Sequence, residues 1–274
     1  MRVSEVLALA RAQGVARLDA QLLLAHHLQR DRSWLLAHDD TEVDAALLSA
    51  YRIDLQRRAD EMPLCYLTGH REFYGLSLHV SAAVLVPRPE TEGLVDWALE
   101  ILRRHSVLWP QPQLADLGTG SGAVALAVKN HWPQADVTAS DDSEAALAVA
   151  RINARNLGLL LGFAAGSWWQ ALATRRFHLV VANPPYIAAG DPHLRALRHE
   201  PQHALTPGGD GLSALAHITA GARDHLHAGG WLLLEHGHDQ SAAVAKLLST
   251  AGLVDVQTRE DHAGLPRCTG ARSP

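Results

Sequence analysis

The chain has 274 residues, of which 47% are hydrophobic and 19% charged, and its formal net charge is −5. This composition excludes a disordered chain and leaves room for two domains or one large one. The acidic balance and the lack of a lysine- or arginine-rich run disfavour a nucleic-acid-coating surface, so no direct nucleic-acid partner is expected.

Cysteine and histidine usage indicates the redox state of the protein's compartment and whether it binds a metal. Cys65 and Cys268 are the two cysteines, far apart in sequence, which disfavours a disulfide framework and indicates a reducing compartment. The amphipathic opening is unlike a signal peptide, and no apolar run reaches membrane-spanning length. We therefore expect a cytoplasmic protein without a membrane partner. The stretches HH (26–27) and EHGH (235–238) lack the ligand spacing of a zinc site, so no metal is expected.

The front of the chain reads as helical. Apolar residues recur at helical spacing in VSEVLALARAQ (3–13) and in LDAQLLLAHHL (18–28). A third helix is predicted over 41–61, with Thr41 as its N-cap. These helices predict a small domain over residues 1–71, which we expect to dock a substrate, because nothing in it resembles a nucleoside site.

The remainder, residues 72–274, predicts an α/β domain. A change to period two around Gly75, within 73–90, predicts a hairpin. Apolar strands then alternate with helices, which is typical of a doubly wound, mainly parallel sheet covered on both faces. The expected strands are 113–118, 136–141, 160–166, 177–183, 231–237 and 253–261. The expected helices are 91–105, 122–131, 143–158, 212–226 and 240–252. The tail from Ala263 onward has no predicted element.

A glycine-rich turn follows the first strand of this alternation. DLGTGSG (116–122) lies where ligands bind in open α/β sheets, beyond the carboxyl end of a strand. Gly118, Gly120 and Gly122 allow backbone to approach a ligand and permit positive φ. The turn lacks the lysine of a phosphate loop and the spacing of the dinucleotide pattern. A tight strand–helix turn without a ligand is the alternative interpretation.

An acidic residue ends the second strand. Asp141 lies about twenty residues past the glycines, where a carboxylate accepts hydrogen bonds from ribose hydroxyls. It is equally suited to the N-terminus of the helix that starts near Ser143, and both roles are compatible. The glycine turn, Asp141 and a polar end of the fourth strand together predict a site for a nucleoside-containing cofactor.

The fourth strand stops abruptly at NPPY (183–186). The Asn183 side-chain oxygen and the Pro184 carbonyl are two acceptors that can bind both hydrogens of an –NH2 group. The prolines stiffen the loop, and Tyr186 can stack on a flat conjugated group. The loop predicts a site for a planar primary amine or amide whose nitrogen is alkylated; a simple strand-terminating turn is the alternative.

Together these motifs resemble a known family. DLGTGSG, Asp141 and NPPY resemble S-adenosylmethionine-dependent methyltransferases that act on exocyclic or amide nitrogen. PLCYLTGHREFYGL, VLVPRPETE, HEPQHAL and LLLEHG narrow the resemblance to the HemK family of peptide chain release factor glutamine N5-methyltransferases. This resemblance spans nearly the whole chain. It implies a Rossmann-like methyltransferase domain, S-adenosylmethionine as cofactor and release factors as protein substrates.

The resemblance also implies roles for individual residues. The cofactor would contact the glycine turn, Asp141, Trp168 and Asn183, with Trp168 flanking the adenine; the turn residues are Gly118, Thr119, Gly120, Ser121 and Gly122. Asn183, Pro184 and Tyr186 would act in catalysis, and the glutamine pocket would be formed by Asn183, Pro184, Pro185, Tyr186, Arg88 and Glu90. Ser167 departs from the family, which usually has aspartate before the tryptophan.

Two related activities are the rivals of this prediction. One is methylation of a glutamine in a ribosomal protein. The other is methylation of adenine N6 in nucleic acid, because NPPY also occurs in such enzymes; the acidic balance of the chain counts against it. A non-catalytic scaffold that retains a cofactor site is disfavoured by the intact NPPY. The sequence therefore favours N5 methylation of glutamine in release factors.

Overall fold

The computed structural model describes residues 1–274. It divides into two compact units, Met1–His70 and Arg71–Pro274. None of its helices has both the length and the apolar character needed to cross a bilayer.

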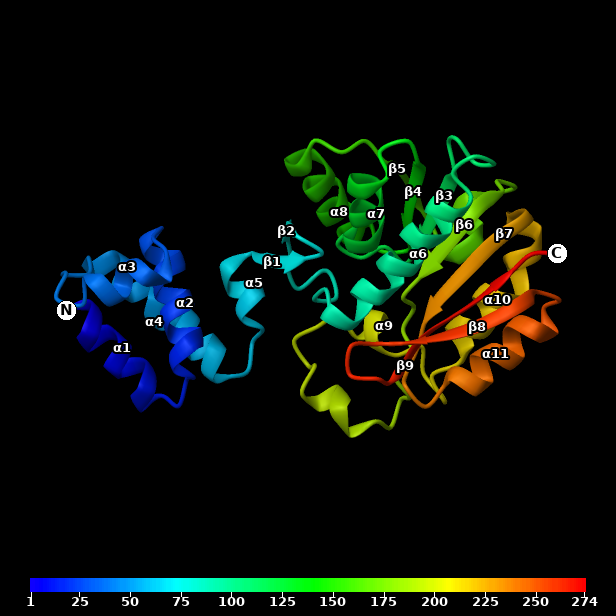
Figure 1. The fold of residues 1–274 in the computed structure, drawn as a ribbon. Coiled ribbons are helices and arrows are strands. Elements are labelled where there is room, and N and C mark those ends of the chain that lie inside the picture. The colour runs from blue at the N-terminus through cyan, green and yellow to red at the C-terminus, as the bar shows by residue number, and fades with distance from the viewer. The chain divides into compact units, whose positions relative to one another are not determined.

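The first unit is a helical bundle around one hydrophobic core (Figure 1). Its helices are α1 (Val3–Ala12), α2 (Arg17–Leu28), α3 (Arg32–Ala37), α4 (Ala45–Ala59) and α5 (Leu64–Thr68). Leu23, Leu24, Tyr51 and Leu55 are among its fully buried side chains. The long amphipathic helices were predicted, whereas α3 and α5 were not, because one or two turns are too short to show a period.

The predicted start of the third long helix is wrong. Asp44, not Thr41, is the N-cap of α4, since its carboxylate accepts hydrogen bonds from the backbone N–H groups of Ala46 and Leu47 at 2.8 and 3.3 Å. Thr41 lies outside the helix, where its carbonyl accepts a hydrogen bond from Val3. Both residue types are good caps, so tertiary contacts of the preceding segment decide between them.

A tight hairpin opens the second unit. β1 (His70–Phe73) and β2 (Leu76–His79) are joined by Tyr74 and Gly75, with φ of 51° and 76°. Two consecutive left-handed residues match the twist of a two-residue hairpin. The hairpin is attached to the following helix, because the Tyr74 backbone donates to Glu92 at 3.0 Å and its hydroxyl donates to Asp96 at 2.6 Å.

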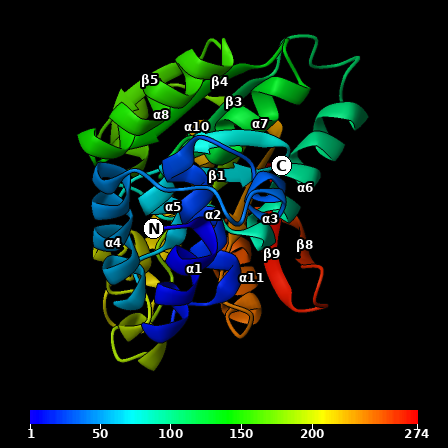
Figure 2. The same cartoon turned by 90° about the vertical axis from the view of Figure 1, so that its left-hand side faces the viewer.

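The second unit is built on a seven-stranded sheet in the order β5-β4-β3-β6-β7-β9-β8. Its strands are β3 (Gln113–Leu117), β4 (Asp136–Asp141), β5 (Gly162–Ala165), β6 (Phe177–Ala182), β7 (Leu226–Glu235), β8 (Val254–Glu260) and β9 (Pro266–Arg272). The first five in chain order run parallel, and β9 runs antiparallel to both β7 and β8. Figure 2 shows β5 and β4 toward one edge and β8 and β9 toward the other.

Helices cover both faces of this sheet, which confirms the doubly wound, mainly parallel fold (Figure 1). One layer is α6 (Glu92–Arg104), α7 (Ala123–His131) and α8 (Glu144–Leu157); the other is α10 (Ser213–His225) and α11 (Ser241–Thr250). Leu179 and Val181 of β6 belong to the first core, and Val180 and Ala182 to the second. A strand buried on both faces therefore reads as a continuous apolar run.

The C-terminal tail forms β9, a strand that was not predicted. It is inserted between β7 and β8, and its residues from Cys268 to Ala271 are buried. Gly270 lies so close to β7 and α6 that a Cβ there would approach Leu233 and Trp97. Small residues suit such a crowded position but have little strand propensity, so the sequence pattern does not predict β9.

The strand order places a site at the middle of the sheet. From β3 the chain winds outward through β4 and β5, then returns to the other side of β3 with β6 and continues through β7. The switch point between β3 and β6 leaves a crevice beyond their carboxyl ends, where α/β folds bind ligands.

Candidate active site

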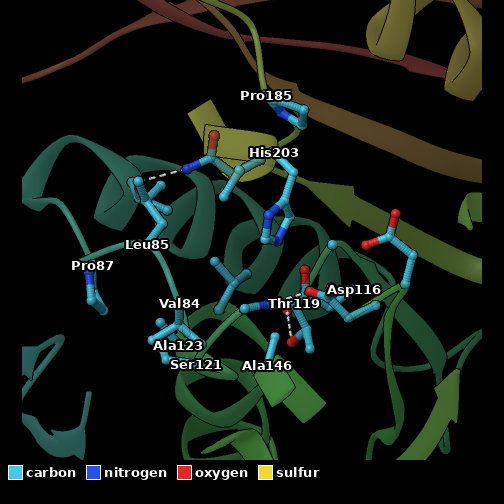
Figure 3. A pocket seen from close by; sticks show the side chains of 18 of the residues that line it. Val84, Leu85, Pro87, Asp116, Thr119, Ser121, Ala123, Ala146, Pro185 and His203 are labelled. Carbon is cyan, nitrogen blue, oxygen red and sulfur yellow. Dashed lines mark hydrogen bonds between the residues drawn. The ribbon is translucent and has the colours of Figure 1, made fainter. Parts of the chain in front are cut away.

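A cavity that is open to solvent lies at this switch point; its volume, including the solvent at its opening, is about 960 Å³. Its lining joins the carboxyl ends of β3, β4 and β6, through Asp116, Asp141 and Asn183. Figure 3 shows Pro185 and His203 on one side of it and Ser121, Ala123 and Ala146 on the opposite side. The predicted site residues that line it are Arg88, Gly118, Thr119, Gly120, Ser121, Asp141, Trp168, Asn183 and Pro185.

The glycine turn forms one wall with its backbone. Gly118 and Gly120 have φ of 72° and 55°, in the left-handed region, and the N–H groups of Gly118 and Thr119 both donate to the Ser140 carbonyl at 2.9 Å. Gly122 does not line the cavity. Its φ is 83°, and a Cβ there would lie 3.2 Å from Ala150 Cβ, so glycine at the N-cap of α7 allows the close approach of α8.

Asp141 is held at the end of β4 by two backbone hydrogen bonds. Its Oδ2 accepts from Gly120 N–H at 2.9 Å, and its Oδ1 accepts from Ser143 N–H at 3.0 Å. Burial raises the pKa of Asp141, against these hydrogen bonds. Ser143 is the actual N-cap of α8, since its hydroxyl oxygen accepts from Ala146 N–H. A carboxylate has about four acceptor positions, so Asp141 retains capacity for a ligand's hydroxyls.

Asp116 is a cavity residue to which the sequence reasoning gave no role. It lies at the end of β3, 3% exposed, and Figure 3 shows it beside Thr119. Its Oδ2 accepts from the Thr119 hydroxyl at 2.7 Å and from Ala125 N–H at 3.2 Å. Burial raises its pKa to about 6, against these two hydrogen bonds. The first letter of DLGTGSG could have indicated it, because an acid at the end of a buried strand rarely serves packing.

This raised pKa predicts a pH dependence of stability. Between about pH 4 and 6 the folded protein holds a proton on Asp116 that the unfolded chain has released, so the free energy of unfolding decreases as pH rises through this window. Asp116→Asn is expected to reduce that decrease by about 1–3 kcal/mol. Urea unfolding across the window, without ligand, measures it. The exposed neighbour variant Asp142→Asn controls for the loss of one charge, and an unaltered slope in Asp116→Asn would contradict the prediction.

Trp168 lies against the glycine turn. A Cβ at residue 118 would lie 3.3 Å from the Trp168 ring. The backbone of Trp168 has a φ of 48°, in the left-handed region. It begins the short helix η2 (Trp168–Leu172), preceded by Ser167, which also lines the cavity. A flat indole face at this wall fits the predicted place of an adenine ring.

The NPPY loop (183–186) is divided between the cavity and the protein interior. Asn183 and Pro185 line the cavity, whereas Pro184 and Tyr186 do not. The Tyr186 hydroxyl instead donates to Glu235 Oε1 at 3.4 Å, and burial raises the pKa of Tyr186. The expected stacking of Tyr186 on a ligand is therefore not part of this arrangement. Its main chain is also held, since Gln240 Nε2 donates to the Tyr186 carbonyl at 3.0 Å.

Arg88 and Glu90 lie on the segment before α6. Arg88 lines the cavity and donates to Glu200, a carboxylate whose other oxygen accepts from Val86 N–H at 3.0 Å. Arg88 thus joins its own segment to the one that leads into α9 (Gln202–Leu205). Glu90 is exposed and does not line the cavity. Next to it, Thr91 does line the cavity, a residue that the sequence reasoning passed over.

Comparison with known proteins identifies relatives of this chain. Family models match residues 4–69 as the PrmC N-terminal domain and residues 92–228 as the methyltransferase small domain. A release factor glutamine methyltransferase of Xylella fastidiosa is 49% identical, covering 97% of this chain and 96% of the relative. One of Bordetella pertussis is 48% identical, covering 94% and 95%. A methyltransferase structure from Pyrococcus furiosus, 18% identical, covers 72% of this chain and 88% of its own with a TM-score of 0.52, which supports the fold.

Proposed function

The chain belongs to the release factor glutamine methyltransferase family, and from this premise we propose that it transfers a methyl group from S-adenosylmethionine to the side-chain amide nitrogen (N5) of a glutamine in peptide chain release factors. The observation that carries the proposal is one cavity that joins the glycine turn, Asp141 and Asn183. A nucleoside site and an amide-binding loop share it.

The residues present fit S-adenosylmethionine. Gly118, Thr119, Gly120 and Ser121 would contact its methionine and ribose parts, Asp141 its ribose hydroxyls and Trp168 its adenine. The carboxylates that line the cavity suit a ligand carrying positive charge. When bound, S-adenosylmethionine supplies a methyl group already activated on a sulfonium.

The protein's own task is to orient the substrate amide. An amide nitrogen is a poor nucleophile because its lone pair is delocalised, so its position relative to the methyl group decides the rate. The Asn183 oxygen, which lies at the cavity, would accept from one N–H hydrogen and favour positive charge that develops on it. The Pro184 carbonyl stays the predicted acceptor for the second hydrogen, although Pro184 does not line the cavity. The two prolines keep these acceptors in place without an ordering cost at each turnover. The extra proton leaves to water.

The helical unit, residues 1–71 in the proposed division, recognises the release factor. Its own core and the absence of its residues from the cavity lining support a role in docking rather than in cofactor binding. In this proposal, recognition of the whole protein substrate resides in the helical unit.

Asp141→Ala is expected to weaken S-adenosylmethionine binding at least about tenfold, because it removes charge-assisted hydrogen bonds worth about 1.5–3 kcal/mol each before water compensates. Titration calorimetry measures the change. The exposed Asp142→Asn serves as a control for charge at the cavity mouth. Wild-type affinity in Asp141→Ala would mean that Asp141 only orders Gly120 and the start of α8.

The proposed function is tested by incubating the protein with methyl-labelled S-adenosylmethionine and a recombinant release factor, then mapping the modified residue by mass spectrometry. A single glutamine gaining one methyl group is expected. Label on a ribosomal protein or on an adenine-containing oligonucleotide, with none on the release factor, would replace the proposal with one of its two rivals.

A further inference from the structure

Two buried polar residues lie behind Asn183 and have no role in the proposed function so far. Thr91, 5% exposed, precedes α6, and Glu235, 1% exposed, ends β7. Asn183 Nδ2 donates to Thr91 Oγ1 at 3.2 Å. The side-chain amide that is to face the substrate therefore has its nitrogen directed to Thr91.

Glu235 contacts the Tyr186 end of the NPPY loop. Its Oε1 accepts from the Tyr186 hydroxyl at 3.4 Å, and its Oε2 is buried without a partner at ordinary hydrogen-bond distance. Burial raises the pKa of Glu235 to about 7, against the lowering influence of the Thr91 hydroxyl, Arg267 and the Tyr186 hydroxyl. Tyr186 therefore donates a hydrogen bond to Glu235, while the Thr91 hydroxyl lies near enough to lower its pKa without a hydrogen bond of ordinary length.

The direction of these hydrogen bonds matters because an asparagine amide has an oxygen that accepts and an NH2 group that donates. A threonine hydroxyl can either accept from the amide nitrogen or donate to the amide oxygen. An ionised carboxylate only accepts. If the hydroxyl proton of Thr91 is directed to Glu235, the Thr91 oxygen is left to accept from Asn183 Nδ2, and Asn183 Oδ1 remains for the substrate. A protonated Glu235 can instead donate to the Thr91 oxygen, so the Thr91 hydroxyl proton can turn toward Asn183 Oδ1 and the amide can flip.

We propose that Thr91 and Glu235 are positioning residues that fix the Asn183 amide with its oxygen toward the substrate, and so make the site select an –NH2 group. The inference rests on the proposed function, because the selected group is the substrate amide. It adds a specificity device: a flipped amide would present N–H donors, which suit a carboxylate rather than an amide nitrogen.

Glu235 must be ionised for this arrangement, so methyl transfer should become slower as pH falls below about 7. The titratable and charged groups that act on it are Tyr186, Arg267, Glu90 and, across the strand pair, Cys268. Arg267 favours the ionised form, and Glu90 opposes it. Burial raises the pKa values of Tyr186 and Cys268, so both stay neutral near pH 7.

Matched threonine variants separate positioning from stability. Thr91→Val keeps the shape but removes the hydroxyl, and should lower kcat about tenfold or more while S-adenosylmethionine affinity stays within about twofold. Thr91→Ser keeps the hydroxyl and should retain kcat within about threefold. Thr219→Val removes a buried hydroxyl in α10 that bonds only to its own helix, and controls for the loss of folding stability. Equal kcat in Thr91→Val and the wild type would overturn the proposal.

Nuclear magnetic resonance provides a readout that needs neither cofactor nor substrate. The Asn183 side-chain NH2 signals, identified by their loss in Asn183→Ala, should shift with a midpoint near pH 7. Glu235→Gln should abolish that shift and, in methylation assays, the pH dependence of kcat. The positioning role would be overturned if the Asn183 NH2 chemical shifts did not change with pH in the wild type, or if they still changed with pH in Glu235→Gln. A lack of activity on release factors with these NMR results intact would instead refute the proposed function.

Discussion

Replacing Asn183 by alanine is expected to lower kcat on a release factor about 10²–10³-fold, the loss that follows removal of one preorganised polar group from an active site. Asn183 lines the cavity at the end of β6, and its amide nitrogen is already bound to Thr91, which leaves its oxygen as the acceptor for the substrate. Without it the cavity loses the side-chain acceptor that orients the nitrogen. Single-turnover kinetics under saturating cofactor measure the effect on the chemical step.

The control for Asn183→Ala is cofactor binding, measured by calorimetry on the same preparation. Affinity should fall much less than kcat, because the glycine turn, Asp141 and Trp168 line the cavity independently of Asn183. A loss confined to affinity, with wild-type turnover at saturation, would contradict the role of Asn183 in orienting the amide.

Changing the substrate should have a still larger effect. A release factor with glutamate in place of the target glutamine has no –NH2 group and directs a carboxylate at two acceptors, so no methylation is expected. Asparagine is shorter by one methylene, which displaces the nitrogen by about 1.5 Å and should slow transfer about 10²-fold or more. Labelled cofactor and single-turnover mass spectrometry distinguish the three substrates.

Binding of the intact release factors is the control for this series, because docking is proposed to reside in the helical unit and not in the glutamine pocket. The three proteins should compete equally for the enzyme in the absence of cofactor. Methylation of the asparagine protein at the glutamine rate would show that the NPPY loop does not hold the nitrogen as proposed.

Much of the fold was predictable because its signals are local. Helical periodicity in the first unit and apolar runs for β3, β4 and β6 arise from residues near one another in sequence. The errors concern segments whose conformation is decided elsewhere. β9 is a strand because β7 and β8 lie on either side of it, and Asp44 is the N-cap of α4 because Thr41 is engaged with Val3.

The sequence by itself determined the motifs from which the site is predicted: a glycine turn, an acid at the end of the next strand and NPPY at the end of β6. The tertiary structure decided which side chains face the cavity. Gly122 packs against Ala150 of α8 and the Tyr186 hydroxyl donates to Glu235, while Asp116, Thr91 and His203 line the cavity. The reason is physical. A motif specifies backbone conformation and residue type, but side-chain direction and ionisation depend on partners that are distant in sequence and close only after folding, as Glu235 is to Tyr186.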